Sequence, residues 1–479
     1  MFSKHFVIVT LVLTLGLVSF VSYRVDAAWP EPRPLVKEFV ASSSSDAMAS
    51  IDLEDPNGIL TLRQALSLAL RRSPKLLAFA WEIRTKEAQI LQAGLLPNPE
   101  LGIEVENFGG SGALQSLDGA ESTLQLSQLI ELGGKRSKRK RISKLEWELA
   151  GWEYELRRLE VFTEITKAFI DVLAAQERLA LIEELVSIAE RIFNTVLERV
   201  KAGKVSPVEE TKASVILATS RIKLDRAKRG LEVTRKRLAA TWGSTSPIFE
   251  KVDGRLEDVR PIPTAEQLVS RISQNPNIVR WFTEMEQRKA AVELENAGRI
   301  SNLTLSGGVK RFSETNDNAF VLGVSIPLPI FNRNQGGILE AQHRLAKADE
   351  ERKASEVHLL TALSETYQAL SSAFSEAIAL KNDVLPGAQS AFETASEGFR
   401  QGKFSYLDVL DTQRTLFETR GQYIKTLTAY HRAVADVEQL IGERLDTVNN
   451  IPEKKSGIDS GHIHRNSDSH AIKSEKRPN

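Results

Sequence analysis

A short acidic motif, DVLDT, brings two carboxylates close together in the C-terminal half of this 479-residue chain. Asp408 and Asp411 are three residues apart, so they share one face of a helix that begins after Ser405. Ser405 and Asp408 have the spacing of a capping box, in which both side chains bond free backbone N–H groups at a helix start. Asp411 lies too far into the helix to cap it. It is either a solvated surface aspartate or a charge that acts on cations.

A second group that could bind an ion lies in the segment GHIHRNSDSH near the C-terminus. His462, His464 and His470 have a spacing that can hold a soft divalent metal, but a polar tail supplies no outer shell to orient such ligands. The sequence has no HExxH, GxSxG or dinucleotide motif, and AGKVS lacks the flanking residues of a phosphate loop. We therefore expect no enzyme, no cofactor and, outside these histidines, no metal site.

Two glycine turns show that the chain contains an internal repeat. RVKAGKVSPVEETKASVILATSR ends at Arg221 and GFRQGKFSYLDVLDTQRTLFETR ends at Arg420, so Gly203 corresponds to Gly402 (402 − 203 = 199). Pro74 and Pro276 continue the match toward the N-terminus at an offset of 276 − 74 = 202. We divide the chain into repeat 1 (59–243), a linker (244–263) and repeat 2 (264–442). Each repeat should contain a medium helix, a β-hairpin, a very long helix, a glycine turn and a second helix.

The residues after each glycine predict the start of the second helix. Ser206 precedes Pro207, which suits the first position of a helix, and Glu209 follows at the capping-box spacing. Ser405 and Asp408 repeat this pattern. Capping explains these serine, proline and acidic residues without any further role.

Each repeat interrupts its helices with two segments in which apolar and polar residues alternate. The period of two predicts strands at about 99–108, 121–130, 302–311 and 320–329. Segments of this length suit tilted strands in an outer membrane. Alternatively, the two hairpins pack on the protein's own helices. In the membrane reading, the lipid-facing residues include Leu101, Ile103, Val105, Leu303, Leu305, Phe320, Leu322 and Val324.

Four strands are too few to close a membrane barrel, and lipid does not tolerate open strand edges. Several chains would therefore contribute to one barrel, with eight strands from a dimer or twelve from a trimer. The opposite face, with Glu104, Glu106, Gln125 and Lys310, would then line water.

The helices predicted between hairpin and glycine turn are unusually long. Residues 134–202 contain no proline and repeat apolar residues at spacings of three and four. Such a helix would be roughly 100 Å long. Residues 335–401 form its counterpart, with one expected kink at Pro386. Helices of this length belong to a coiled coil or a helical tube rather than to a compact globule.

The two ends of the chain read as segments outside the repeats. Residues 1–27 have the basic start, apolar core and small-residue site of a signal peptide, with cleavage expected after Ala27. A retained anchor is the alternative. Residues 28–58 should be an extended segment and 443–479 a polar, disordered tail. The sequence has no cysteine, so we expect no disulfide and no N-terminal lipid anchor.

The doubled order of elements, the hairpins and the glycine turns resemble the TolC-like outer-membrane efflux proteins over about 59–442. LLPNPELGIEVENFGG and STLQLSQLIELGGKR are similar to the CzcC-type branch, which serves heavy-metal efflux. The resemblance implies a mainly α fold with a membrane β-barrel, in which three chains form twelve strands and a periplasmic helical tunnel. It also implies a location in the cell outer membrane. The implied partners are a periplasmic adaptor and a proton-driven inner-membrane pump of the RND type.

The resemblance also assigns roles to the two turns and the acidic motif. It implies that Asp408 and Asp411 ring the periplasmic mouth of the channel, and that Phe399 and Phe404 occupy the places of its basic and tyrosine partners. It further implies that the turns are tips that contact the adaptor. The tip residues are Gly203, Lys204, Val205, Ser206, Gly402, Lys403, Phe404 and Ser405.

One further motif, GGKRSKRKRISK at 133–144, is strongly basic. Because no aromatic or groove-reading pattern accompanies it, we expect no nucleic-acid partner. It should lie beneath the membrane near phosphate head groups or the tunnel wall, or form a solvated helix start. For the whole chain, we expect an exit duct for heavy-metal cations. The alternatives are a duct for drugs or secreted polypeptides, and a soluble periplasmic coiled-coil adaptor or scaffold.

Overall fold

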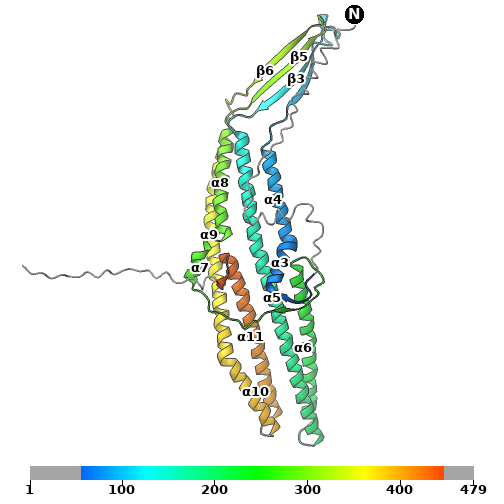
Figure 1. Ribbon diagram of the computed structural model, residues 1–479, viewed down its shortest axis with the longest axis vertical. Coiled ribbons are helices and arrows are strands. Elements are labelled where there is room, and N and C mark those ends of the chain that lie inside the picture. The colour runs from blue at the N-terminus through cyan, green and yellow to red at the C-terminus, as the bar shows by residue number, and fades with distance from the viewer. Residues whose placement is uncertain (1–54, 447–479) are drawn as a thin grey trace, which may run out of the picture. The chain divides into compact units, whose positions relative to one another are not determined.

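The computed structural model describes residues 55–446, and the elements below all belong to the unit that begins at Pro56. The expected signal peptide, the extended segment up to residue 54 and the three tail histidines lie outside the described residues. Long helices dominate this unit, and a four-stranded sheet lies beyond one end of them (Figure 1). None of the described helices combines the length and the apolar composition that crossing a membrane requires.

The two repeats place similar elements in the same order. Those of repeat 1 are α3 (Leu62–Arg72), α4 (Pro74–Ala93), β2 (Glu100–Glu106), β3 (Glu121–Ile130), α5 (Lys135–Lys201) and α6 (Pro207–Ala240). Those of repeat 2 are α7 (Ala265–Ile272), α8 (Pro276–Ala297), β5 (Leu303–Phe312), β6 (Asn318–Ser325), α9 (Gln335–Ala379), α10 (Leu385–Arg400) and α11 (Tyr406–Ile441).

Each repeat begins with two helices, whereas we expected one medium helix. The break falls at Ser73 in repeat 1 and at Asn275 in repeat 2, where the backbone is extended. Pro74 and Pro276 follow at the first position of α4 and α8. A proline disfavours helical backbone in the residue before it, so the earlier helix ends there and a new one begins.

Prolines also explain two local departures in repeat 2. We expected a kink at Pro386. The structure has a π-helical turn at Leu380–Val384, directly before α10, in which Pro386 is the second residue. Proline lacks an N–H and its ring crowds the preceding turn, so the helix widens there. Strand β6 ends at Ser325 and not near 329, because Pro327 and Pro329 have no N–H for the sheet.

The linker between the repeats contains a strand that the sequence did not reveal. Residues Phe249–Asp253 (β4) pair in parallel with Gly58–Thr61 (β1), which lies directly before α3. The Gln176 side chain of α5 donates to the Val252 carbonyl (3.2 Å) and accepts from the Val252 N–H (2.8 Å). These bonds attach the linker to the middle of α5.

The linker is also attached to α11. The Tyr430 hydroxyl donates to the Arg260 carbonyl (2.9 Å) and accepts from the Arg260 N–H (3.1 Å), and a ring nitrogen of His431 lies 2.8 Å from the Leu256 carbonyl oxygen. The linker thus joins helices from both repeats.

The long helices pack along one another rather than around one central core. Helix α5 contacts α4, α6, α8 and α11, while α9 contacts α8 and α11 (Figure 1). One apolar cluster joins α7, α9 and α11, and it includes Leu445 from the predicted tail. Residues 443–446 are therefore packed and not disordered, since Leu445 is buried and its N–H bonds Glu438 (3.0 Å). This burial could not be read from the polar residues around Leu445.

Candidate functional site

The two glycine turns have the same backbone geometry. Gly203 follows α5 with φ 70° and Gly402 follows α10 with φ 76°, both in the left-handed region that glycine adopts most readily. In each turn the N–H of the next lysine reaches back five residues, from Lys204 to the Arg199 carbonyl (2.9 Å) and from Lys403 to the Gly398 carbonyl (2.8 Å). This is the Schellman arrangement that closes a helix end. The turns therefore form two equivalent exposed tips.

The residues after each glycine start the next helix, but only one tip forms the full capping box. Ser405 and Asp408 bond each other's backbone N–H groups at the start of α11, as predicted. Ser206 caps α6 through the Val208 N–H (3.3 Å), without a reciprocal bond from Glu209. The predicted capping box of the first tip is therefore wrong. Glu209 turns inward, and one of its carboxylate oxygens is buried without a hydrogen bond in the described structure.

The inward position of Glu209 affects a tyrosine of the other tip. The pKa of the Tyr406 hydroxyl is raised to about 12. Burial is the larger cause, and the negative charge of Glu209 is the smaller one. Tyr406 belongs to an apolar cluster with Val196, Phe399 and Val409, which joins the tip ends of both helical hairpins.

The two aspartates of the acidic motif have different partners. Asp408 accepts bonds from the hydroxyl and the N–H of Ser405 (2.7 and 2.8 Å), and these bonds hold the pKa of its carboxyl below the ordinary value. Asp411 is paired with Arg414 one turn on (2.8 Å), and both side chains are 68% exposed. Asp411 therefore carries an exposed charge, but this charge is not free of a partner. It lines a groove of about 610 Å³ between α11 and the α5–α6 pair.

Two aromatic residues beside the acidic motif pack in ways the sequence did not show. The Arg199 guanidinium lies over the Phe399 ring (4.6 Å to its centre) and donates to the Phe399 carbonyl (3.2 Å). Phe404 lies against Gly398, where an added Cβ would come within 2.0 Å of the ring. Arg199 thus joins α5 to the end of α10. The repeat pairs Arg199 with Gly398 and not with Phe399, so no signal in the sequence pointed to this contact.

At the other end of the helices, β2, β3, β5 and β6 form one antiparallel sheet in that order. In an antiparallel register, residues that are paired across strands share a face. The pairing therefore gathers the apolar positions on one side and the polar positions on the other. Two apolar rows are Ile103–Leu124–Val309–Phe320 and Leu101–Leu126–Gly307–Leu322.

The apolar face is largely uncovered in the single chain. Phe320 is 88% exposed, Leu322 87% and Val324 69%. Seven of the eight residues expected to face lipid are exposed, and Leu303 is half-buried. The hairpins therefore do not pack this face on the protein's own helices, which was the alternative.

The opposite face carries charged side chains that pair with one another. Lys310 of β5 forms ion pairs with Glu106 of β2 (3.0 Å) and Glu121 of β3. Gln125 and Glu104 share this face by register. The sheet thus has one oily and one wet side, as its alternation predicted.

The basic run ties the sheet to the helices. Lys135, the first residue of α5, donates to the Ile300 carbonyl (2.5 Å) and the Asn302 side chain (2.6 Å) of repeat 2. Arg139 forms an ion pair with Glu131. The hydrogen bond from Arg139 is the main cause that lowers the pKa of the Glu131 carboxyl. Several of these basic residues therefore have partners within the chain.

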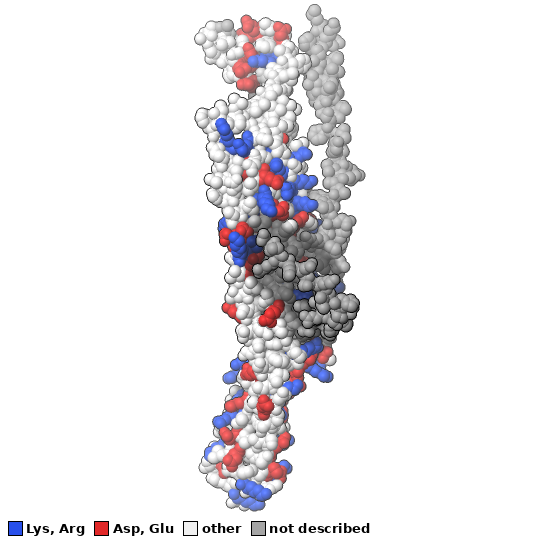
Figure 2. All heavy atoms as spheres, turned by 90° about the vertical axis from the view of Figure 1, so that its left-hand side faces the viewer, with Lys and Arg blue, Asp and Glu red and all other residues white. Residues whose placement is uncertain are grey.

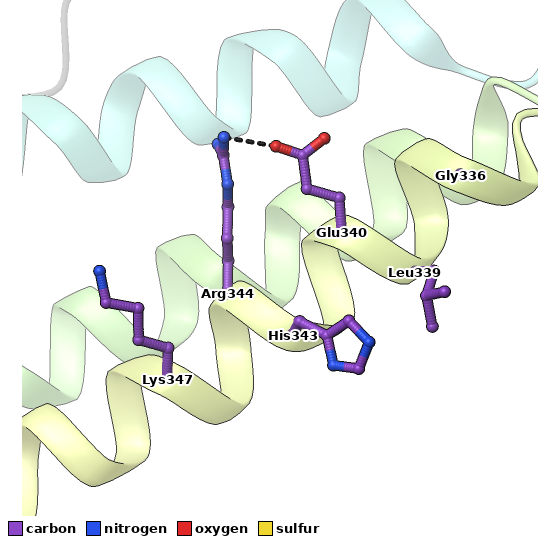
Figure 3. Close-up of a pocket in the computed structure, with 6 residues that line it drawn as sticks. All are labelled: Gly336, Leu339, Glu340, His343, Arg344 and Lys347. Atoms are coloured by element: carbon purple, nitrogen blue, oxygen red, sulfur yellow. Dashed lines mark ion pairs between the residues drawn. The ribbon is translucent and has the colours of Figure 1, made fainter.

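Scattered histidines do not form a metal site in the part of the chain that the structure describes. No three His, Cys, Asp or Glu side chains there are placed to hold one ion. A surface hollow of about 600 Å³ on α9 contains His343, but its other lining residues all come from the same helix. Figure 3 shows Arg344 and Glu340 pointing toward each other, joined by an ion pair of 2.5 Å, while His343 is turned away.

Sequence comparison decides which family this architecture represents. The profile of the outer membrane efflux protein family matches residues 65–244 and 268–443. The chain belongs to this family. It is 38% identical over 401 residues to the cobalt-zinc-cadmium resistance protein CzcC of Cupriavidus metallidurans, covering 84% of this chain and 94% of that protein. It is 26% identical to the nickel-cobalt-cadmium resistance protein NccC of Alcaligenes xylosoxydans xylosoxydans, covering 62% of this chain and 66% of that protein.

Solved structures give the same fold. The structure of CusC superimposes with a TM-score of 0.66 at 16% identity, covering 82% of this chain and 95% of that one. These matches confirm the predicted fold class, a mainly α chain with strands for a membrane β-barrel. This member of the outer membrane efflux protein family is a channel of the cell outer membrane, the exit duct of a tripartite efflux system, and not an enzyme.

Proposed function

We propose that this outer membrane efflux protein exports divalent heavy-metal cations. The observation that carries the proposal is the 38% identity to CzcC, whose name records cobalt, zinc and cadmium resistance, over 94% of that protein. NccC, named for nickel, cobalt and cadmium resistance, supports the same substrate class. The drug-duct alternative has weaker support, since the toluene efflux protein TtgF of Pseudomonas putida is 21% identical.

The sheet supports assembly of three chains. Strands β2 and β6 are the two edges of the sheet, each with a row of unpaired backbone groups. In lipid such edges must pair with another chain. Three copies would join β6 of one chain to β2 of the next and give a closed barrel of twelve strands. Its oily side would face lipid and the Lys310 side would face water.

The tips support a periplasmic partner. Helix α5 has 67 residues and runs from the end of β3 to the first tip, so the tip lies roughly 100 Å from the sheet. If the sheet lies in the outer membrane, both tips extend deep into the periplasm. We propose that they contact the periplasmic adaptor. We further propose that the energy comes from a proton-driven inner-membrane pump of the RND type, the partner that the resemblance to the TolC-like efflux proteins implies.

The acidic motif supports a gate for cations at the same end. Asp408 and Asp411 lie just beyond the second tip, and three copies would bring six carboxylates to the periplasmic mouth. A ring of carboxylates favours cations over anions. Since Asp408 is occupied by its cap, Asp411 is the residue that meets the permeating ion.

Metal tolerance tests the substrate. Deleting the gene should lower tolerance to cobalt, zinc and cadmium salts and raise cell-associated metal, and the intact gene should restore both. Tolerance to dyes and detergents should stay unchanged. If the deletion sensitises cells to organic compounds and leaves metal tolerance intact, the duct serves drugs and the metal assignment is wrong.

A further inference from the structure

The two tips offer a partner the same side chain at the same place. Lys204 follows Gly203, and Lys403 follows Gly402, in turns with matching backbone hydrogen bonds. Both lysines are exposed. Because the turns correspond at an offset of 199 residues, one chain presents this lysine twice.

These lysines differ from the other basic residues of the tips. Lys201 pairs with Glu198 (2.9 Å), Arg400 pairs with Glu397, and Arg199 is held on Phe399. Within residues 55–446, the Nζ atom of neither Lys204 nor Lys403 has a hydrogen bond or an ion pair. Nor do the tip serines compete for a ligand, since both cap their helices.

The residues that close each helix end are also basic. Residues 199–204 and 398–403 together contain five Lys and Arg and no Asp or Glu. Figure 2 shows Lys and Arg side chains at the very end of the helices, farthest from the sheet, with acidic side chains beginning directly above them. Because the neighbouring Glu198 and Glu397 are taken up by Lys201 and Arg400, the two lysines are left as unpaired positive groups that fit a partner of the opposite charge.

We propose that Lys204 and Lys403 each bind a carboxylate on the tip of the periplasmic adaptor. This inference rests on the proposed docking of the adaptor at these turns and adds the chemistry of the contact. An anionic lipid surface is a poorer fit, because the chain's continuous apolar face lies on the sheet, at the opposite end of α5.

Zero-length cross-linking tests the contact directly. Carbodiimide joins a lysine amine to a carboxylate only when the two groups touch, so it should link Lys204 and Lys403 to Asp or Glu residues of the periplasmic protein that co-purifies with the tagged, full-length channel. Exposed Lys228 on α6 is the matched control and should form no such link. Links only to another copy of this chain would overturn the proposal.

Charge variants separate the lysine contact from docking in general. K204R/K403R should keep co-purification of the adaptor while losing the cross-link, because arginine retains the charge but is not coupled. K204E/K403E should reduce co-purification about tenfold or more, as expected when a close charge pair becomes repulsive. Changing the cross-linked carboxylate of the adaptor to lysine should restore binding to K204E/K403E.

The possible failures are distinguishable. If K204E/K403E binds the adaptor as well as the wild type, the lysine contact is wrong while docking stands. If the wild-type channel binds no periplasmic protein under conditions in which it supports metal tolerance, the proposed docking itself is wrong.

Discussion

Asp411 carries the most specific prediction among single residues, and its partner allows a test in both directions. The Asp411–Arg414 pair is exposed, so solvent and salt screen it and it adds little stability, about 0–1 kcal/mol. The pair should affect a permeating ion more than it affects stability, because Arg414 offsets the charge of Asp411 at the point where cations would bind.

In planar bilayers, Asp411→Ala should weaken cation preference and reduce block by divalent cations. Arg414→Ala should do the opposite, because it leaves the Asp411 charge uncompensated. Glu365→Ala, at an exposed position on α9, is the control and should change neither property. A control on α11 itself, such as Glu438, would be less suitable. Burial raises the pKa of the Glu438 carboxyl, and this carboxyl accepts a hydrogen bond from the Leu445 N–H. Unchanged block in both variants would mean that Asp411 is an ordinary surface aspartate.

The glycine turns make a prediction about how the helices end. An added Cβ at Gly402 would meet no atom within 4 Å, so any penalty comes from its φ of 76°. Left-handed backbone costs an ordinary residue roughly 1–2 kcal/mol. Gly402→Val should therefore impair metal tolerance while trimers still reach the outer membrane, and Gly402→Asn should impair it less, because asparagine tolerates this region.

Gly421 is the matched control for that prediction. It lies within α11, its φ is not positive, and it also has open space around an added Cβ. Gly421→Ala should be neutral or stabilising, since alanine favours a helix. Loss of trimer in Gly402→Val would show that the glycine serves folding alone.

The two faces of the sheet predict opposite tolerance to charge. Leu322 is 87% exposed on the apolar face, while Ser306 lies on the polar face. Leu322→Arg should cost roughly 2–4 kcal/mol if it lies near the midplane of the membrane, and Ser306→Arg far less. Heat stability of trimers extracted from outer membranes measures both. Equal losses would count against a lipid-facing role for the apolar rows.

The linker between the repeats acts on the molecule as a whole, because it bonds α5 through Gln176 and α11 through Tyr430 and His431. Burial is the first cause that lowers the pKa of His431 below its ordinary value of 6.5. The unfolded chain therefore takes up a proton first as the pH falls. The contribution of His431 to the free energy of unfolding should therefore be fully present above about pH 6.5 and should decrease below it.

Urea unfolding of the purified trimer at pH 7.5 and pH 5.5 measures this decrease. We expect a lower midpoint at pH 5.5, and a smaller difference in His431→Gln, which cannot take up the proton. Asp258 is the acidic neighbour that opposes the shift, so Asp258→Asn should steepen the pH dependence. An identical pH dependence in wild type and His431→Gln would remove the histidine from this account.

Periodicity and repetition within the chain determined most of the architecture. The period of two located the four strands and their faces, because a strand alternates its side chains whatever it packs against. The offset of 199 residues paired the glycine turns, because both close a helix in the same left-handed backbone. Local bonding also explains why Ser405 and Asp408 were read correctly as a capping box.

Contacts between distant residues were settled only by the tertiary structure. Glu209 has the same local spacing as Asp408, yet its charge acts on Tyr406, because the starts of α6 and α11 both belong to the apolar cluster at the tips. The pairing of β1 with β4 joins segments almost 190 residues apart, and no local pattern announces it. Side-chain periodicity reports which face of an element is buried, whereas the neighbour that buries it depends on how the whole chain packs.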